Sequence, residues 1–407
     1  MIRQTQAFAA RPVPEGTAYG RPPGYTDELL TRVGPGTPCG ELMRRYWQPV
    51  LVAEGVTRRP QAVRMLGEDL IVFRDGDGRP GLLYERCGHR GASLFWGHVE
   101  EDGIRCCYHG WKFDVEGHCL EQPCEPKGGV NRAAHRQPWY PVEEHYGLLW
   151  AYMGPPDRMP LFPRFDCMEL EEGERYFAFD NSIPSHADAN GPAILPNSWL
   201  NINDNCMDPA HVEVLHATFS TTQFVSLFAT SPKLKFEAIE GGVIYKADRN
   251  LDDGRRMRRV NSWFAPNITS VPSLTAEAGG SNSLTIFLPV DDTHCRVFGA
   301  FRVKADFKGI FAGAGFADAK PWTQMTLEER QDMPGDYEAQ SGFSLHSEEH
   351  LVTTDIGIGL QRRLLRREVD KVSKGEDPVG IAFEPGAEIV RVPSGNFYYA
   401  ADERTGL

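Results

Sequence analysis

The sequence has no hydrophobic segment long enough to cross a membrane. No run approaches the roughly 18 apolar residues that a transmembrane helix requires, and the first 20 residues are polar and interrupted by proline, unlike a secretory signal. Basic residues are also few, since 43 Lys and Arg stand against 56 Asp and Glu, a formal net charge of −13. We therefore expect a cytoplasmic protein that binds neither nucleic acid nor membranes, because both reward basic surfaces.

The sequence also lacks internal repeats, low-complexity tracts and the glycine motif that opens a dinucleotide-binding βαβ unit. The chain is therefore not expected to take hydride from NAD(P)H itself. Its 407 residues, of which 41% are hydrophobic, suffice for two or three domains with cores of their own. The nine cysteines are an odd number, and where they cluster with histidines they favour metal binding over disulfides.

Turn signals and alternation divide the chain into three parts. Residues 1–46 contain an N-terminal extension and two short helices around a Gly/Pro break, which we expect to pack on the last domain. Short strands with hairpin signals follow over 47–155, up to a proline-rich boundary. Longer strands and a final helical stretch occupy 156–407. The pattern predicts an α+β protein whose last domain has a large antiparallel sheet with flanking helices.

Two pairs of Cys and His lie in the strand-rich part. Cys87 and His89 form a C-x-H pair, and sixteen residues later Cys106 and His109 form a C-x2-H pair. Iron–sulfur clusters are held by thiolates, and a Rieske centre replaces two of the four with imidazoles on one iron. Spacing alone leaves three alternatives open, namely structural zinc, unrelated core residues, and Cys107 in place of Cys106.

A second group of side chains that could bind a metal lies in the last domain, within a stretch of nine residues. Asp208, His211 and His216 offer one carboxylate and two imidazoles, the ligand types of oxygen-activating non-haem iron(II). His211 and His216 are five residues apart, which is about 140° around a regular α-helix. One metal could bind both only at a kink or a π-bulge. Two ordinary surface or core histidines remain the alternative.

The residues around both groups resemble one family. CGHRGASLFWG and CCYHGWKFDVEG are similar to the ligand loops of Rieske domains, which selects Cys106 over Cys107. SWLNINDNCMDPAHVEVLH resembles the iron-binding segment of Rieske non-haem iron ring-hydroxylating oxygenases, in their terminal oxygenase (alpha) subunits, especially the phthalate dioxygenase and aromatic O-demethylase branch. The resemblance covers nearly the whole chain after residue 25. It implies a Rieske-type antiparallel β domain followed by a helix-grip catalytic domain.

The resemblance also assigns roles to individual residues. It implies a 2Fe–2S cluster held by Cys87, His89, Cys106 and His109, and a mononuclear Fe(II) bound by His211 and His216. Asp208 would be a bridge that accepts hydrogen bonds from His211 and from His109 of the partner subunit. Asn205 would lie near the iron.

The third iron ligand must come from another segment. EHLVTTD at residues 349–355, followed by a basic helix, resembles the family's C-terminal pattern, which implies that Asp355 is this ligand. Without the resemblance, Asp355 would be expected only to cap or begin the helix.

The implied function is that of a terminal oxygenase in a multi-component system. A flavin and 2Fe–2S reductase would supply electrons from NAD(P)H, and O2 would be used to cis-dihydroxylate or oxidatively O-demethylate an aromatic, carboxylated substrate. The assembly would be a homotrimer or a trimer-based hexamer. Two other classes compete, a Rieske electron carrier with a non-catalytic second domain and a structural zinc protein.

Three further features have ordinary interpretations. The arginine run at 255–259 could pair with a carboxylate, although a solvated strand edge is favoured. His186 and His346 are expected to be structural or exposed.

Overall fold

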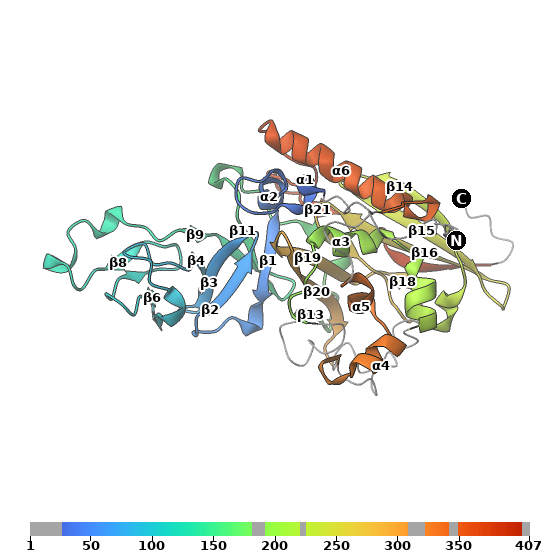
Figure 1. The fold of residues 1–407 in the computed structure, drawn as a ribbon, viewed down its shortest axis with the longest axis horizontal. Coiled ribbons are helices and arrows are strands. Elements are labelled where there is room, and N and C mark those ends of the chain that lie inside the picture. The colour runs from blue at the N-terminus through green and yellow to red at the C-terminus, as the bar shows by residue number, and fades with distance from the viewer. Residues whose placement is uncertain (1–26, 181–191, 220–224, 308–321, 342–348, 401–407) are drawn as a thin grey trace, which may run out of the picture.

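The computed structural model describes residues 27–180, 192–219, 225–307, 322–341 and 349–400. The chain forms a narrow lobe of small sheets, on the left of Figure 1, and a larger lobe built on one extended sheet with helices. No helix in these described ranges is long and apolar enough to cross a membrane.

The narrow lobe consists of antiparallel sheets, as the alternation of short apolar and polar stretches predicts. One four-stranded sheet has the order β2-β3-β4-β9 and another has the order β5-β6-β7-β8. Phe73, Leu83 and Phe113 belong to a buried core of this lobe's own. The strands of the two sheets are β2 Gln61–Met65, β3 Glu68–Arg74, β4 Pro80–Tyr84, β5 His98–Glu100, β6 Gly103–Arg105, β7 Lys112–Phe113, β8 Cys119–Glu121 and β9 Trp139–Tyr140.

The large lobe is built on a nine-stranded antiparallel sheet with the main order β13-β20-β19-β17-β16-β15-β14. Strand β22 lies outside this order and pairs with β16 and with the short β18. The nine strands are β13 Glu174–Asp180, β14 Lys233–Ile239, β15 Gly242–Asn250, β16 Arg256–Phe264, β17 Ile268–Ser270, β18 Gly279–Gly280, β19 Ser283–Asp291, β20 His294–Lys304 and β22 Gly395–Tyr399. The predicted large antiparallel sheet is therefore confirmed.

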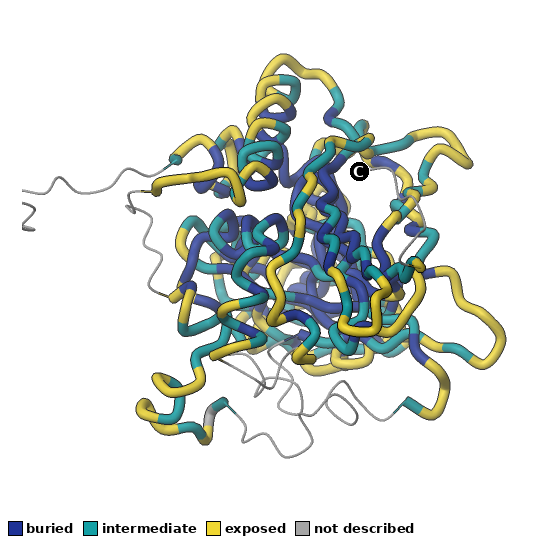
Figure 2. The backbone as a smooth tube through the Cα atoms, turned by 90° about the vertical axis from the view of Figure 1, so that its right-hand side faces the viewer, coloured by how far each residue is buried: buried dark blue, intermediate teal, exposed yellow. Residues whose placement is uncertain are grey.

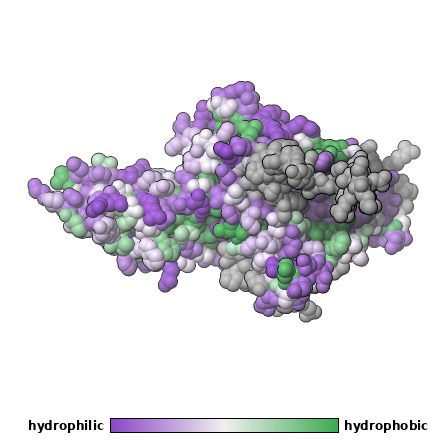
Figure 3. Space-filling model, in the orientation of Figure 1, coloured by the Kyte–Doolittle hydropathy of each residue, from purple (hydrophilic) through white to green (hydrophobic). Residues whose placement is uncertain are grey.

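Helices flank this sheet. The longest, α6, packs against β14, β15 and α2 through a side that includes Leu365 and Val369. Its outer side is hydrophilic in Figure 3, as expected for an amphipathic helix on a core. The α-helices are α1 Glu28–Thr31, α2 Pro38–Arg44, α3 Trp199–Asp204, α4 Leu327–Asp332, α5 Asp336–Gln340 and α6 Ile356–Ser373.

The two lobes join through packed structure. A three-stranded sheet, β1-β11-β10, lies at the junction, and a buried cluster of hydrophobic residues runs continuously from β3 and β11 into β19. The tip of the β2–β3 hairpin also pairs with β19, because the Leu66 and Gly67 amides donate to Pro289 and Val290, each at 2.9 Å. Figure 2 shows the buried residues gathered in the middle of the molecule. The junction strands are β1 Trp47–Val52, β10 Val142–His145 and β11 Leu148–Tyr152.

The proline-rich stretch that suggested a boundary packs against this junction. Phe162 stacks on His145 with ring centroids 3.7 Å apart, and it also contacts Trp150. A short parallel pair, β12 Arg164–Phe165 with β21 Ile389–Val390, ties the end of the stretch to the C-terminal region. The proline-rich stretch therefore contacts both the junction sheet and the C-terminal region of the chain.

Candidate metal centres

The first group of predicted ligands lies on two matching turns. The Gly91 amide donates to the Cys87 carbonyl at 2.8 Å, and the Gly110 amide donates to the Cys106 carbonyl at 3.1 Å. Both glycines have positive φ angles, +75° and +71°, a conformation that side-chain-bearing residues rarely adopt. Each turn thus presents one cysteine and one histidine.

The side chains on the two turns face one another. Cys87 and Cys106 are each only 3% exposed, whereas Cys107 is exposed. The rings of His89 and His109 have centroids 4.6 Å apart, and His89 stacks flat on Trp111. Burial raises the pKa of the Cys87 thiol to about 12 in the metal-free chain.

The arrangement fits a two-iron cluster better than a zinc ion. Nδ1 of His89 is buried and has no hydrogen-bond partner among the described residues, which is costly unless a metal takes its lone pair. Tetrahedral zinc would hold its ligand atoms about 3.3–3.8 Å apart. Among the described residues, one group of three ligand atoms lies within 4.8 Å of one another, and it consists of His211, His216 and Asp336. The four side chains of the two turns do not form such a group.

A buried glutamine supports the first turn. Gln137 is fully buried, and its Oε1 accepts from the Gly88 amide at 2.7 Å. Its Nε2 donates to the carbonyls of Tyr84 and Arg86 at 2.7 and 2.8 Å. Sequence reasoning missed this residue, because nothing in its neighbourhood resembles a ligand motif.

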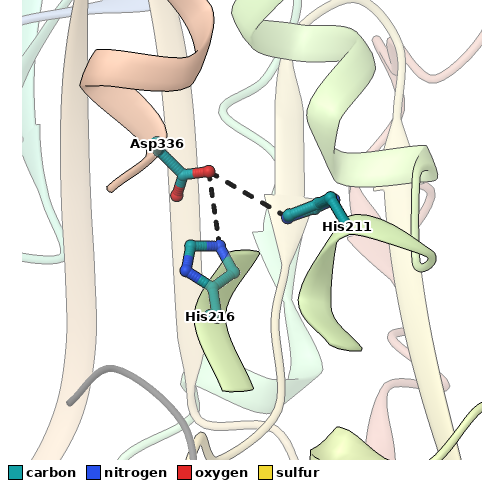
Figure 4. Close-up of side chains that lie close together, drawn as sticks. All are labelled: His211, His216 and Asp336. Atoms are coloured by element: carbon teal, nitrogen blue, oxygen red, sulfur yellow. Dashed lines mark ion pairs between the residues drawn. The ribbon is translucent and has the colours of Figure 1, made fainter. Parts of the chain in front are cut away.

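The second group is shaped by a π-helix. The helix η8, Val212–Phe219, begins directly after His211 and contains His216. Its i→i+5 hydrogen-bonding pattern places residues five apart on nearly the same side. The two histidine rings consequently have centroids 5.1 Å apart and point toward a common space (Figure 4). The structure thereby supplies the irregularity that the spacing of the two histidines requires.

The carboxylate that completes this group is Asp336, at the start of α5. Its Oδ1 lies 3.3 Å from Nε2 of His216 and 4.0 Å from Nε2 of His211 (Figure 4). The three residues form the one set of at least three His, Cys, Asp or Glu side chains among the described residues whose ligand atoms lie within 4.8 Å of one another. Two imidazoles and one carboxylate are the donor set of a mononuclear iron(II) site.

The structure does not bring Asp355, the carboxylate that the sequence analysis expected, to this group. Asp355 is absent from the set, and its Oδ2 accepts from the Val352 amide at 2.7 Å, where the chain enters α6. The physical reason is its position at a helix start, where a carboxylate satisfies backbone amides. Asp355 therefore stabilises the short 3-10 turn Thr353–Asp355 that precedes α6, and its side chain makes no capping hydrogen bond to α6 itself.

Sequence reasoning missed Asp336 because its signal is weak. Asp336 follows a Pro-Gly break and opens a five-residue helix, where acidic residues are common without any metal. It also lies 120 residues after His216 in the chain, so no local spacing connects them. Treating every acidic residue between 325 and 355 as a candidate would have included it.

The electrostatics favour an ionised carboxylate at this position. Burial raises the pKa of Asp336, but hydrogen bonding with His216 and the charges of both histidines outweigh it and lower the pKa to about 2. Asn205, which we expected near the metal, donates from Nδ2 to Asp336 Oδ1 at 3.2 Å. Oδ1 of Asp336 thus faces both histidines and also accepts from Asn205.

Asp208 lies beside His211. Its Oδ1 accepts from the Ala210 amide at 3.0 Å, and its Oδ2 lies 3.5 Å from Nδ1 of His211. Burial lowers the pKa of His211, but Asp208 and Asp336 outweigh it and raise the pKa. A carboxylate behind a histidine is a common support for a metal ligand.

A cavity of about 310 Å³ is lined in part by His211, His216 and Asp336. Phe179, Leu195, Phe287 and Val297 form an apolar part of its wall, and Arg259, Asn261 and Thr269 form a polar part. The volume falls within the range of small-molecule sites.

The arginine run is not uniformly a solvated strand edge. Arg259 is 2% exposed, and it donates to the carbonyls of Pro272 and Ser273 behind the cavity. Arg258 pairs with Asp248 on the neighbouring strand. His186 and His346 lie outside the described residues.

Comparison with known proteins agrees with this geometry. Residues 46–141 match the family model of the Rieske [2Fe-2S] domain. The chain is 51% identical over 392 residues to the phenoxybenzoate dioxygenase subunit alpha of Ectopseudomonas oleovorans, covering 95% of both chains. It is 36% identical to the oxygenase subunit of tert-butanol monooxygenase / tert-amyl alcohol desaturase from Aquincola tertiaricarbonis, over 86% of this chain and 80% of the relative.

A solved structure shares the fold. Dicamba monooxygenase bound to 3,6-dichlorosalicylic acid superposes with a TM-score of 0.62 at 16% identity, covering 82% of this chain and 99% of the other. The two cluster turns are of Rieske type, and the second group combines two histidines with a carboxylate. Relatives also match over most of their length. The chain is the oxygenase subunit of a Rieske non-haem iron oxygenase.

Proposed function

We propose that the two groups of side chains hold the two metal centres that this family uses. The cluster ligands are Cys87, His89, Cys106 and His109, and the iron ligands are His211, His216 and Asp336. The convergence of Asp336 with the two histidines beside a cavity carries the proposal. Bound iron would supply the O2-dependent oxidation of a substrate held in that cavity.

The residues around the iron ligands prepare them for the metal. Asp208 faces Nδ1 of His211, which favours a proton on that nitrogen and leaves Nε2 to bind the metal. The phenyl rings of Phe179 and Phe287 form part of the apolar wall of the cavity, which disfavours water there. The chain therefore fixes the histidine tautomer and shields the reacting space.

Electrons from NAD(P)H would reach the cluster through a separate reductase and then cross between subunits. The cluster turns, beside β6, and the π-helix segment lie at opposite ends of the molecule in Figure 1. A neighbouring copy is thus needed to bring His109 of the partner subunit to Asp208, whose side chain is 28% exposed. We propose a homotrimer, or a hexamer made of trimers, in which Asp208 accepts these hydrogen bonds.

Assemblies that contain two different variants test electron transfer between subunits directly. Co-expression of chains carrying Cys106→Ser with chains carrying Asp336→Ala should restore product formation, although each variant alone is inactive. Mixed assemblies that stay inactive, while mass spectrometry shows both chains in one particle, would contradict electron transfer between subunits.

The proposed substrate is an aromatic carboxylate related to phenoxybenzoate. The relative of that name matches along 95% of its length, and the cavity combines aromatic walls with a polar part near Arg259 and Asn261. The same iron site performs cis-dihydroxylation and oxidative O-demethylation, so product identification has to separate them.

The test combines metal analysis with a substrate screen. Three Fe per chain supports an oxygenase, and two supports a Rieske carrier with a non-catalytic second domain. The screen uses a surrogate reductase and measures O2 uptake with phenoxybenzoates, phthalate isomers and methoxybenzoates, with tert-butanol as the non-aromatic comparison. Turnover of tert-butanol alone would contradict the aromatic assignment.

A further inference from the structure

The carboxylate of Asp336 is held by two amide side chains from different segments. Asn205, after α3, donates to Oδ1 at 3.2 Å, and Gln340, at the end of α5, donates to the same oxygen at 3.3 Å. Asp336 and Gln340 are four residues apart, so both lie on one side of the short helix. The oxygen nearest the two histidines is therefore also the one that the amides restrain.

Gln340 is itself fixed in place. Its side chain lines the cavity, yet the residue is only 5% exposed. Its backbone carbonyl accepts from Nδ2 of Asn197 at 2.7 Å, and Asn197 is 3% exposed just before α3. A carboxylate oxygen only accepts, so the amide nitrogen of Gln340 must be the atom that faces it. A short helix of five residues is thus tied at its end to the segment that leads to the histidines.

We propose that Gln340 is a positioning residue for the iron site. Its amide holds the Asp336 side chain so that Oδ1 points between His211 and His216, and the tie through Asn197 keeps α5 at the right distance. Without the amide, the carboxylate can rotate about its side-chain bonds, and the metal must then restrict this motion when it binds. This inference rests on the proposed assignment of Asp336 as an iron ligand.

The variant Gln340→Met tests the role, because methionine keeps the length and most of the volume while it removes the donor. The apparent Fe(II) dissociation constant is measured by equilibrium dialysis of protein stripped of the mononuclear iron only. We expect a 10–100-fold weaker affinity, the usual effect of losing support behind a ligand. The Rieske absorption spectrum, which reports the other centre, should not change.

Gln361→Met is the matched control. Gln361 is also a buried glutamine, and it lies on α6, outside the cavity lining. Its Nε2 donates to the carbonyl of Asn203, on α3, at 3.2 Å. Its loss should lower the melting temperature without changing Fe(II) affinity. Equal weakening of Fe(II) binding by both variants would show a general structural effect and overturn the positioning role.

The variant Asp336→Asn distinguishes the positioning role of Gln340 from the assignment of Asp336 as an iron ligand. Loss of Fe(II) binding in Asp336→Asn with wild-type affinity in Gln340→Met would overturn only the role of Gln340. Wild-type Fe(II) affinity in Asp336→Asn would show that the ligand assignment itself is wrong. Weakened binding in both, with Gln361→Met unchanged, supports the positioning role.

Discussion

The two candidate metal centres are built in different ways. The four cluster ligands lie within 23 residues, on two glycine-containing turns of one small lobe. The iron group joins a π-helix to an aspartate 120 residues later in the chain, on a short helix held by amides. A local centre can therefore be identified from its sequence motif. A dispersed centre depends on how distant segments pack.

The largest effect is expected at the local centre. Cys106→Ser should abolish the cluster and all turnover, because the serine hydroxyl is a poor substitute for a soft thiolate ligand. Acid-labile sulfide, visible absorption and EPR measure the loss. Cys107→Ser is the matched control, since this neighbouring thiol is exposed. A cluster that survives in Cys106→Ser and disappears in Cys107→Ser would reverse the assignment of the second thiolate.

The next effect concerns the ligand that the sequence did not reveal. Asp336→Ala should weaken Fe(II) binding at the mononuclear site by more than about 100-fold, because it removes one of three protein ligands. The Rieske spectrum should persist, since the two centres share no ligand. Asp355→Ala should keep the iron and lose about 1 kcal/mol of stability, because it removes the hydrogen bond with the Val352 amide. Iron loss in Asp355→Ala but not in Asp336→Ala would restore the original expectation from the sequence.

A smaller effect is expected for the residue proposed to link the centres. Asp208→Asn should leave both metals bound but slow single-turnover oxidation of the cluster about 10–100-fold, because the neutral amide is a weaker acceptor for two histidine N–H groups. Stopped-flow absorbance at the cluster band measures the rate, and iron analysis serves as the control. A rate equal to that of the wild type would show that Asp208 is not the bridge.

The smallest effect probes what supports the local centre. Gln137→Leu should keep the cluster spectrum but lower the free energy of unfolding by about 1–3 kcal/mol, because the Gly88 amide and two carbonyls lose their buried partner. Urea unfolding of the holoprotein measures the change. Loss of the cluster in a variant with wild-type stability would mean that Gln137 acts on the ligands themselves.

Particular residues show how far sequence reasoning reached. The longer strands of both lobes, apart from β14, and the helices at each end could be predicted, because alternation and helical spacing are local properties. The short β18 and β22 could not be, since their pairing with each other and with β16 depends on long-range contacts. Gln137, Gln340 and Asn197 could not be identified either, because a buried amide carries no motif.

The cysteine and histidine pairs, the two histidines near residue 211, the α+β organisation and, through resemblance, the family could all be predicted from the amino-acid sequence alone. Those features depend on side chains that are neighbours in the chain. Which carboxylate lies beside the two histidines depends on long-range packing, because Asp336 and Asp355 both lie at the start of a helix near the C-terminal end. Packing places Asp336 beside His216, while the Asp355 carboxylate accepts from the nearby Val352 amide. The physical reason is that a metal site requires proximity in space, which spacing along the chain specifies only within a single local element.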